Sequence, residues 1–180
     1  MAIFVSLFRA INVGGSGKVG MATLKEMHEA LGLKNVVTYL QTGNVVFESD
    51  ETDPTKLAGQ IGQEFEKKFG FQAETIVRTS AQLKELFDKN PFLNQSEKET
   101  KWVVVMFLNA CPDAQAKQAL LSSYPGPEEL VITDQELYIY YSNGIGRSKL
   151  TNALIEKKLK VAGTGRNWNT VTKLLEMLQL

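Results

Sequence analysis

The stretch VVTYLQTGNVVFE, residues 36–48, holds two strand-like runs, Val36–Gln41 and Asn44–Glu48, on either side of Thr42-Gly43. β-branched and aromatic residues are enriched in strands, and a two-residue turn that contains glycine favours a hairpin. Before this hairpin come an apolar strand at residues 2–8 and a helix at 21–31; after it come a helix from Asp53-Pro54 to Gly70 and a strand at 74–79. The order β-α-β-β-α-β predicts a ferredoxin-like α+β half with an antiparallel sheet.

A second half with a similar pattern follows. Residues 80–89 form a short connecting helix, and the polar stretch from Asn90 to Thr100 is the predicted boundary. The pattern then gives a strand at 102–108, a helix at 113–122, strands near 129–133 and 136–141, and a helix at 149–160, without a clear final strand. A last helix at 168–178 presents an apolar face. We therefore predict two domains, residues 1–89 and 98–180, as two ferredoxin-like halves with an extra C-terminal helix.

Composition limits the classes of function. The chain has 180 residues and no net charge, with 20 basic and 20 acidic residues, which argues against a general nucleic-acid coat protein but not against a local basic patch. The single cysteine, Cys111, excludes an internal disulfide and is typical of a reducing cytoplasm. No segment approaches the roughly 20 apolar residues of a membrane helix. We expect a cytoplasmic protein with no membrane partner, and the oligomeric state stays open.

Three polar, glycine-rich segments carry basic residues: GGSGKVG at 14–20, GIGRS at 144–148 and GTGRNW at 163–168. Each is expected to lead the chain onto the first turn of a helix. A helix start offers unpaired N–H groups and a partial positive charge, and glycine lets a ligand approach the backbone closely. We therefore predict that an anion can bind at these three segments.

The predicted topology brings the first of these segments to the hairpin turn, because the end of the first strand and that turn share one edge of the sheet. We call this edge the N-terminal rim and assign to it Arg9, Asn12, Lys18, Gln41 and Asn44. Arg147, Lys149 and Arg166 are the candidate ligand-binding residues elsewhere. A basic residue at a helix start is repelled by the positive end of the helix dipole, and a bound anion would offset this repulsion. On this basis, replacing Arg166 should weaken ligand binding and leave the ligand-free protein stable.

Better-known motifs do not fit. Residues 15–20 match G-x-G-x-x-G, but the next strand enters a hairpin and lacks the acidic end of a dinucleotide fold. The P-loop pattern fails because Val19 follows Lys18 where Ser or Thr must hold magnesium. No Cys, His and carboxylate cluster has metal-ligand spacing, so the sequence predicts no metal, no cofactor and no identified catalytic residue. His28 is expected in solvent on the polar edge of its helix, and Trp168 in the core.

Several segments resemble a known family. They are RAINVGG at 9–15, TYLQTGNVVF at 38–47, Asn90-Pro91-Phe92, Ser148-Lys149-Leu150 and TGRNWNTV at 164–171, and they span almost the whole chain. In this order they are similar to the bacterial domain of unknown function 1697 family. Thr42 stands where that family usually has Ser, and Gly20 where it usually has Pro. The resemblance implies a stand-alone α+β protein of two ferredoxin-like halves and carries over no catalytic role.

Three functional hypotheses follow from the residues. The first is a module that binds a phosphate-bearing ligand, either a nucleotide or a nucleic acid, at the glycine-rich basic loops. The second is an enzyme of unidentified reaction, in which Lys18 or Arg9 stabilises a developing negative charge but no general base is evident. The third is an interaction or structural protein whose loops are only connectors.

Overall fold

The computed structural model describes residues 1–179, which form two compact units. The first comprises Met1–Glu85 together with the chain from Lys173 onward, and the second comprises Leu86–Thr172. Two helices, α3 (Ser80–Asp88) and α6 (Trp168–Leu178), each begin in one unit and end in the other. Within the described residues, no helix has the length and apolar character needed to cross a bilayer.

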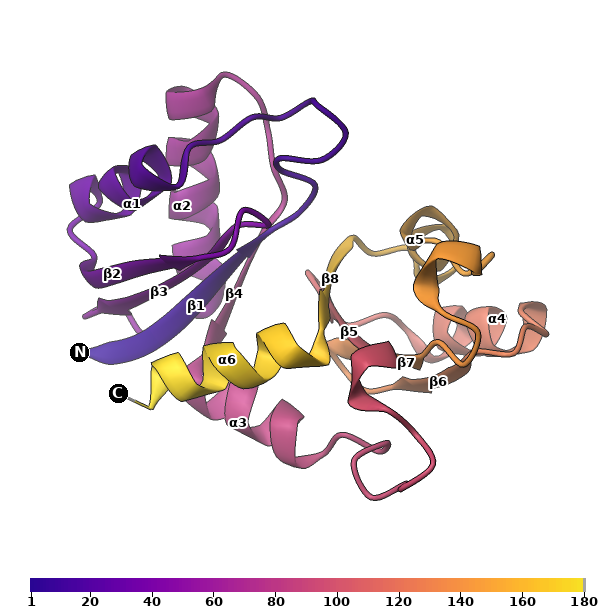
Figure 1. Cartoon of the computed structure of the whole chain (residues 1–180). Helices are drawn as coiled ribbons and strands as arrows, with labels where there is room; N and C mark the ends of the chain where they lie inside the picture. Colours follow the sequence, from indigo (N-terminus) through magenta and orange to yellow (C-terminus); the bar gives the residue numbers. More distant parts are fainter. Residues whose placement is uncertain (180) are drawn as a thin grey trace. The chain divides into compact units, whose positions relative to one another are not determined.

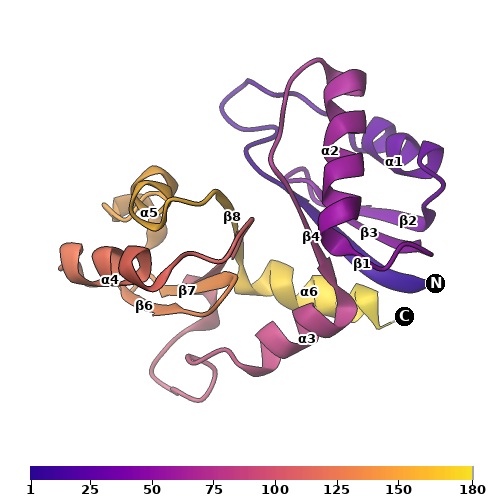
Figure 2. The same cartoon turned by 180° about the vertical axis from the view of Figure 1, so that it is seen from behind.

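The first unit has the predicted order of elements (Figures 1 and 2). They are β1 (Ala2–Phe8), α1 (Met21–Ala30), β2 (Lys34–Tyr39), β3 (Asn44–Ser49), α2 (Pro54–Phe69) and β4 (Thr75–Thr79). The strands form an antiparallel sheet in the order β2-β3-β1-β4. One core joins this sheet to both helices, with Phe4 and Phe8 from β1, Leu24 from α1, and Ile61 and Phe65 from α2 all buried. Helices α1 and α2 therefore cover the same face of the sheet.

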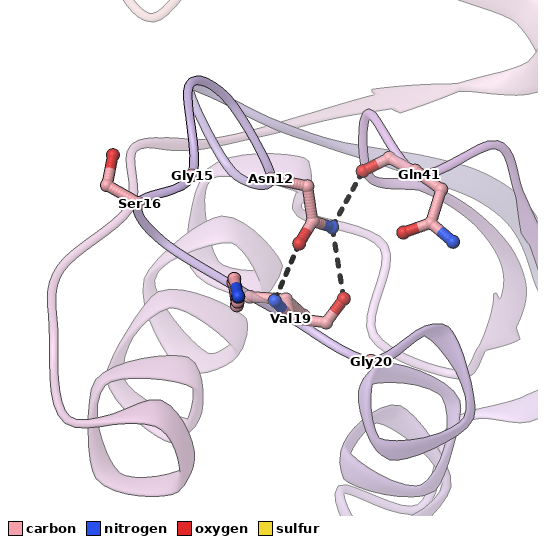
Figure 3. Close-up of a pocket in the computed structure, with 7 residues that line it drawn as sticks. Asn12, Gly15, Ser16, Val19, Gly20 and Gln41 are labelled. Atoms are coloured by element: carbon pink, nitrogen blue, oxygen red, sulfur yellow. Dashed lines mark hydrogen bonds between the residues drawn. The ribbon is translucent and has the colours of Figure 1, made fainter.

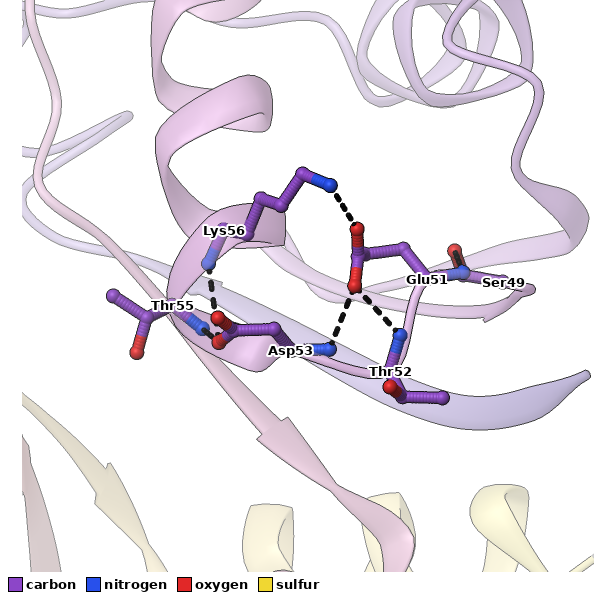
Figure 4. A network of polar contacts seen from close by, with 6 residues as sticks. All are labelled: Ser49, Glu51, Thr52, Asp53, Thr55 and Lys56. Atoms are coloured by element: carbon purple, nitrogen blue, oxygen red, sulfur yellow. Dashed lines mark hydrogen bonds and ion pairs between the residues drawn. The ribbon is translucent and has the colours of Figure 1, made fainter.

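Side chains fully occupy the start of α2 (Figure 4). Asp53 Oδ1 accepts hydrogen bonds from the backbone N–H groups of Thr55 at 2.8 Å and Lys56 at 3.3 Å. Glu51 Oε1 accepts from the backbone of Thr52 at 3.0 Å and Asp53 at 3.1 Å, and its other oxygen forms an ion pair with Lys56. The hydrogen bond from Lys56 lowers the pKa of Glu51. This helix start needs no further partner for its N–H groups.

The turn between β2 and β3 is longer than predicted. Tyr39 pairs with Asn44, so the loop has four residues, and β2 ends before Gln41. Gly43 has a φ of +84°, and a Cβ there would lie 2.5 Å from Ile11 Cδ1 and 3.0 Å from Phe8 Cβ. The turn therefore requires glycine at this position both for its backbone conformation and for its close approach to the loop that follows β1.

The second unit repeats the same order with β5 (Val103–Leu108), α4 (Ala114–Ser123), β6 (Glu129–Ile132), β7 (Glu136–Tyr140), α5 (Asn152–Leu159) and β8 (Gly163–Asn167). Its antiparallel sheet has the order β6-β7-β5-β8, and short 3₁₀ turns occur at Thr100–Trp102 and Ile145–Arg147. The core includes Met106 from β5, Leu120 from α4, Ile139 from β7 and Ile155 from α5. The α+β class with two β-α-β-β-α-β halves is confirmed.

Strand β8 corrects the prediction that the second half lacks a final strand. The segment 163–167, expected to be a loop, pairs antiparallel with β5, with Arg166 opposite Val105. A Cβ on Gly163 would lie 2.8 Å from the backbone oxygen of Phe107, and one on Gly165 would lie 3.3 Å from Val104 Cγ1. Close packing against β5 thus calls for glycine at these two positions, and the strand Gly-Thr-Gly-Arg-Asn contains no apolar side chain whose alternation would indicate a strand.

His28 is buried, which overturns its predicted exposure. Its side chain has 0% exposure, with Nδ1 at 2.8 Å from the backbone oxygen of Leu24 and Nε2 at 3.0 Å from Ser6 Oγ. Burial lowers the pKa of His28 to about 4. The core position of Trp168 is confirmed, since it is buried and stacks on Phe87 with ring centroids 4.8 Å apart.

Candidate functional site

The glycine-rich segment after β1 forms a tight hairpin, which we call the glycine hairpin (residues 13–16). Gly14 and Gly15 have φ values of +60° and +81°, and Ser16 N donates to the oxygen of Val13 at 3.2 Å. Positive φ at both central residues is the type I′ turn, which glycine adopts readily. Val13 and Ser16 also form an isolated antiparallel bridge, so this segment has a defined turn structure.

Asn12 holds the base of this hairpin (Figure 3). Its Oδ1 accepts from Val19 N at 2.7 Å, and its Nδ2 donates to the backbone oxygens of Val19 at 3.0 Å and Gln41 at 2.9 Å. The bond to Gln41 joins the loop after β1 to the turn after β2, so the topology argument behind the N-terminal rim is correct for these two loops. Asn12 positions the backbone, and its contact with a ligand stays a prediction.

A pocket of about 410 Å³ opens beside the glycine hairpin. Its lining residues carry no carboxylate and are Asn12, Gly15, Ser16, Lys18, Val19, Gly20 and Gln41. The side chains of Lys18 and Gln41 are exposed at its edge. The pocket thus brings together three of the five residues assigned to the N-terminal rim.

Helix α1 begins at this pocket, and no side chain caps it. Its N-cap is Gly20, with no side-chain hydrogen bond, and its first turn has no acidic residue. In the described part of the chain, the other five α-helices have side-chain caps from Asp53, Thr79, Asp113, Thr151 and Asn167. The first-turn N–H groups of α1 lack such a partner, and they lie where Gly20 lines the pocket.

The other two members of the N-terminal rim lie outside the lining of this pocket. Asn44 is buried, and its Nδ2 donates to the backbone oxygen of Tyr39 at 2.7 Å and to Thr42 Oγ1 at 3.1 Å. It therefore stabilises the turn between β2 and β3. Arg9 is half-buried, and its backbone N donates to the oxygen of Glu74 at 2.9 Å.

Arg147 and Lys149 lie at a different pocket, in the second unit. Its volume is about 640 Å³, and its lining comprises Tyr124, Pro125, Gly126, Pro127, Glu128, Asn143, Arg147 and Lys149. Arg147 and Lys149 do not lie at the start of a helix, as the sequence had predicted. Arg147 ends a 3₁₀ turn, and α5 starts at Asn152 with Thr151 as its cap. Their charges therefore do not oppose a helix dipole, and that part of the sequence argument is wrong.

Arg166 is buried within β8 and lines neither pocket. Its side chain is 6% exposed, and Nη1 donates to Thr164 Oγ1 at 2.7 Å and to the oxygen of Gly165 at 2.9 Å. Burial lowers the pKa of Arg166 to about 10. The sequence prediction placed this arginine in an exposed loop before a helix, and it is wrong about that environment.

Sequence reasoning missed a polar network in the second pocket. Glu128 accepts hydrogen bonds from Tyr124 Oη and Ser148 Oγ, both at 2.6 Å. The hydroxyl of Ser148 donates to Glu128 Oε1, and the cap of α5 is Thr151 instead. The one available signal was the run Tyr-Pro-Gly-Pro-Glu at 124–128, in which two prolines restrict the backbone between an aromatic side chain and an acid.

Comparison with known proteins addresses the family and the fold. No curated protein matches the chain significantly. Among solved structures, a conserved bacterial protein from Streptococcus pneumoniae superposes with a TM-score of 0.81 at 21% identity, covering 100% of this chain and 99% of the other. At that identity, the likeness establishes the fold alone. The profile of a family described as a protein of unknown function, DUF1697, matches residues 1–138. The chain therefore belongs to the DUF1697 family.

Proposed function

We propose that the chain is a binding module that holds a phosphate-bearing ligand, a nucleotide or a nucleic acid, in the pocket between the glycine hairpin and the start of α1. The observation that supports this proposal is the uncapped start of α1, which opens into a pocket that has a lysine and no carboxylate. Helix starts bind anions because their N–H groups point outward and the helix dipole favours negative charge.

Each lining group has a role in this proposal. The N–H groups at the start of α1 would contact phosphate oxygens, and the exposed Lys18 would supply a full positive charge. The exposed Gln41 side chain can donate from the opposite side of the pocket. Asn12 would keep these two sides at a fixed separation through its bonds to Val19 and Gln41. We also propose a cytoplasmic location, which the single Cys111 supports.

Titration calorimetry of the full chain with inorganic phosphate, ATP and a single-stranded RNA oligonucleotide tests this function. Binding should be measurable at about 20 mM salt and fall steeply by about 200 mM, because phosphate contacts release counterions. Lys18→Ala should weaken binding about 10- to 100-fold, the effect of losing one charged hydrogen bond.

The matched control is Lys68→Ala, which removes an exposed lysine of α2 that does not line the pocket. It should bind like the parent protein. Absence of binding for all three probes at low salt would overturn the proposal. Equal losses in the two lysine variants would also overturn it, because they would indicate a non-specific charge effect.

A further inference from the structure

The second pocket holds a carboxylate whose position is fixed from two sides. Glu128 Oε2 accepts from Tyr124 Oη and Oε1 accepts from Ser148 Oγ, each at 2.6 Å. A carboxylate has about four lone-pair positions, which is more than these hydrogen bonds and that of its own backbone N–H occupy, so a ligand can still bind to it. Partial burial acts to raise the pKa of Glu128, but the hydrogen bonds from Ser148 and Tyr124 outweigh it and hold the pKa below its ordinary value. Glu128 is therefore negatively charged at neutral pH.

The surrounding segments hold this carboxylate in place. Ser148 Oγ also accepts from Leu150 N at 3.0 Å, which fixes the hydroxyl that Glu128 uses. Ser142 Oγ donates to the oxygen of Pro127 at 3.1 Å and so ties the loop 124–128 to the chain after β7. A Cβ on Gly126 would overlap the ring of Tyr124, so glycine is what lets this ring lie over the loop. The pocket is thus a built structure and not a gap between mobile side chains.

Two cations share this pocket without pairing with Glu128. Arg147 and Lys149 are exposed, and among the described residues neither forms an ion pair or a side-chain hydrogen bond. The carboxylate is directed to Tyr124 and Ser148 instead. The pocket therefore presents one negative group and two positive groups, all available to a ligand.

We propose that this pocket binds a small zwitterion of the class of free amino acids and short peptides, with its ammonium group on Glu128 and its acid group on Arg147 and Lys149. A simple anion would meet the charge of Glu128, and a simple cation would meet two positive charges, whereas a zwitterion satisfies both signs. Tyr124, Pro125 and Pro127 offer an apolar wall for a side chain. The volume of about 640 Å³ suits a small molecule.

This inference concerns a different site and a different ligand class from the phosphate pocket, so each can fail alone. Amide NMR spectra of the full chain would be recorded with the dipeptide glycyl-phenylalanine, with an equimolar mixture of the twenty amino acids, and with inorganic phosphate. The dipeptide or the mixture should give saturable shifts at residues 124–128 and 143–149. N-acetylation or C-terminal amidation of the dipeptide should weaken its binding at least about tenfold, because each removes one charge.

Substitutions of single charged residues test which charges of the second pocket the ligand needs. Glu128→Gln should weaken zwitterion binding at least about tenfold and strengthen phosphate binding at the same residues, because it removes the repelling charge. Arg147→Ala should weaken binding of both, and Lys157→Ala, an exposed lysine of α5 outside the pocket lining, should change neither. Three outcomes would overturn the proposal: no shifts at residues 124–128 and 143–149 with about 10 mM probe, equal binding of the acetylated dipeptide, or a stronger response of these same residues to phosphate than to any zwitterion in the parent protein.

Discussion

Asn12 Nδ2 donates a hydrogen bond to the backbone oxygen of Gln41 across 2.9 Å, linking two loops that are 29 residues apart in sequence. The same amide also holds both backbone groups of Val19, just before α1. One side chain thus fixes the loop after β1, the turn after β2 and the approach to α1. The shape of the candidate phosphate pocket depends on this one residue.

Asn12→Ala should lower the free energy of unfolding by about 2 kcal/mol, since it loses three hydrogen bonds at a partly exposed site. Asn12 has a φ of +54°, which asparagine tolerates and alanine does not. Asn12→Gly loses the same bonds without that strain, so its loss should be smaller by about 1 kcal/mol. Urea denaturation of the two variants provides the measurement, and equal losses would argue against backbone strain at this position.

His28 should make the fold sensitive to mild acid. Its pKa is lowered by burial from 6.5 to about 4, so the unfolded chain binds a proton more readily than the folded one. The stability linked to neutral His28 is complete above pH 6.5, falls as the pH drops below that value, and is lost once the pH passes about 4. The shift corresponds to about 3 kcal/mol in total.

Urea denaturation at pH 7 and at pH 4.5 tests this prediction. His28→Gln should be less stable than the parent protein at pH 7, because the buried hydrogen bonds to Ser6 and Leu24 are disturbed. Between the two pH values, however, the variant should lose clearly less stability than the parent. Parallel losses in the two proteins would mean that other groups cause the acid sensitivity.

The parts of the fold that the sequence predicted correctly depend on local signals. The Asp53-Pro54 start and the Gly70 end of α2 lie within the helix's own sequence, as does the apolar face that includes Ile61. His28 was misplaced because its burial depends on Ser6, which is 22 residues away. Strand β8 was missed because its glycines are explained only by their approach to β5. Distant pairing decides these features, and no short window of sequence contains it.

For the candidate sites too, some features could be predicted from the sequence and others could not. The topology of one β-α-β-β-α-β half was enough to predict that the loop with Asn12 meets the turn with Gln41. The pocket around Glu128 could not be predicted in this way, because Tyr124 and Ser148 come to it from separate loops whose shapes are irregular. Arg147 was chosen as a candidate residue because it was expected at a helix start, and the start of α5 at Asn152 invalidates that reason.

Arg166→Ala should destabilise the protein by about 2–4 kcal/mol, contrary to the sequence-based prediction that the ligand-free protein tolerates it. The guanidinium is 6% exposed and donates to Thr164 Oγ1 and the oxygen of Gly165, so alanine removes both of these hydrogen bonds and leaves the space of a buried side chain unfilled. Arg147→Ala is the matched control, because that arginine is exposed, and its effect should stay within about 0.5 kcal/mol. Thermal melts of both variants decide the matter, and a tolerated Arg166→Ala would refute the structural role.

Gly20→Asp should show how much the N–H groups at the start of α1 contribute to ligand binding, apart from the other groups of the phosphate pocket. Gly20 has a φ of −72°, and a Cβ there would meet only Thr23 Oγ1 at 3.6 Å, so a side chain fits without strain. Aspartate is a favoured N-cap, so the variant should be more stable by a few tenths of a kcal/mol, up to about 1. Its carboxylate would occupy the N–H groups that we assign to the ligand and should weaken phosphate or ATP binding at least about tenfold.

Gly20→Ala adds no cap and should keep binding within about twofold of the parent. Calorimetric titration and thermal melts of both variants measure the two effects, and tight binding by a stabilised Gly20→Asp protein would place the anion away from α1.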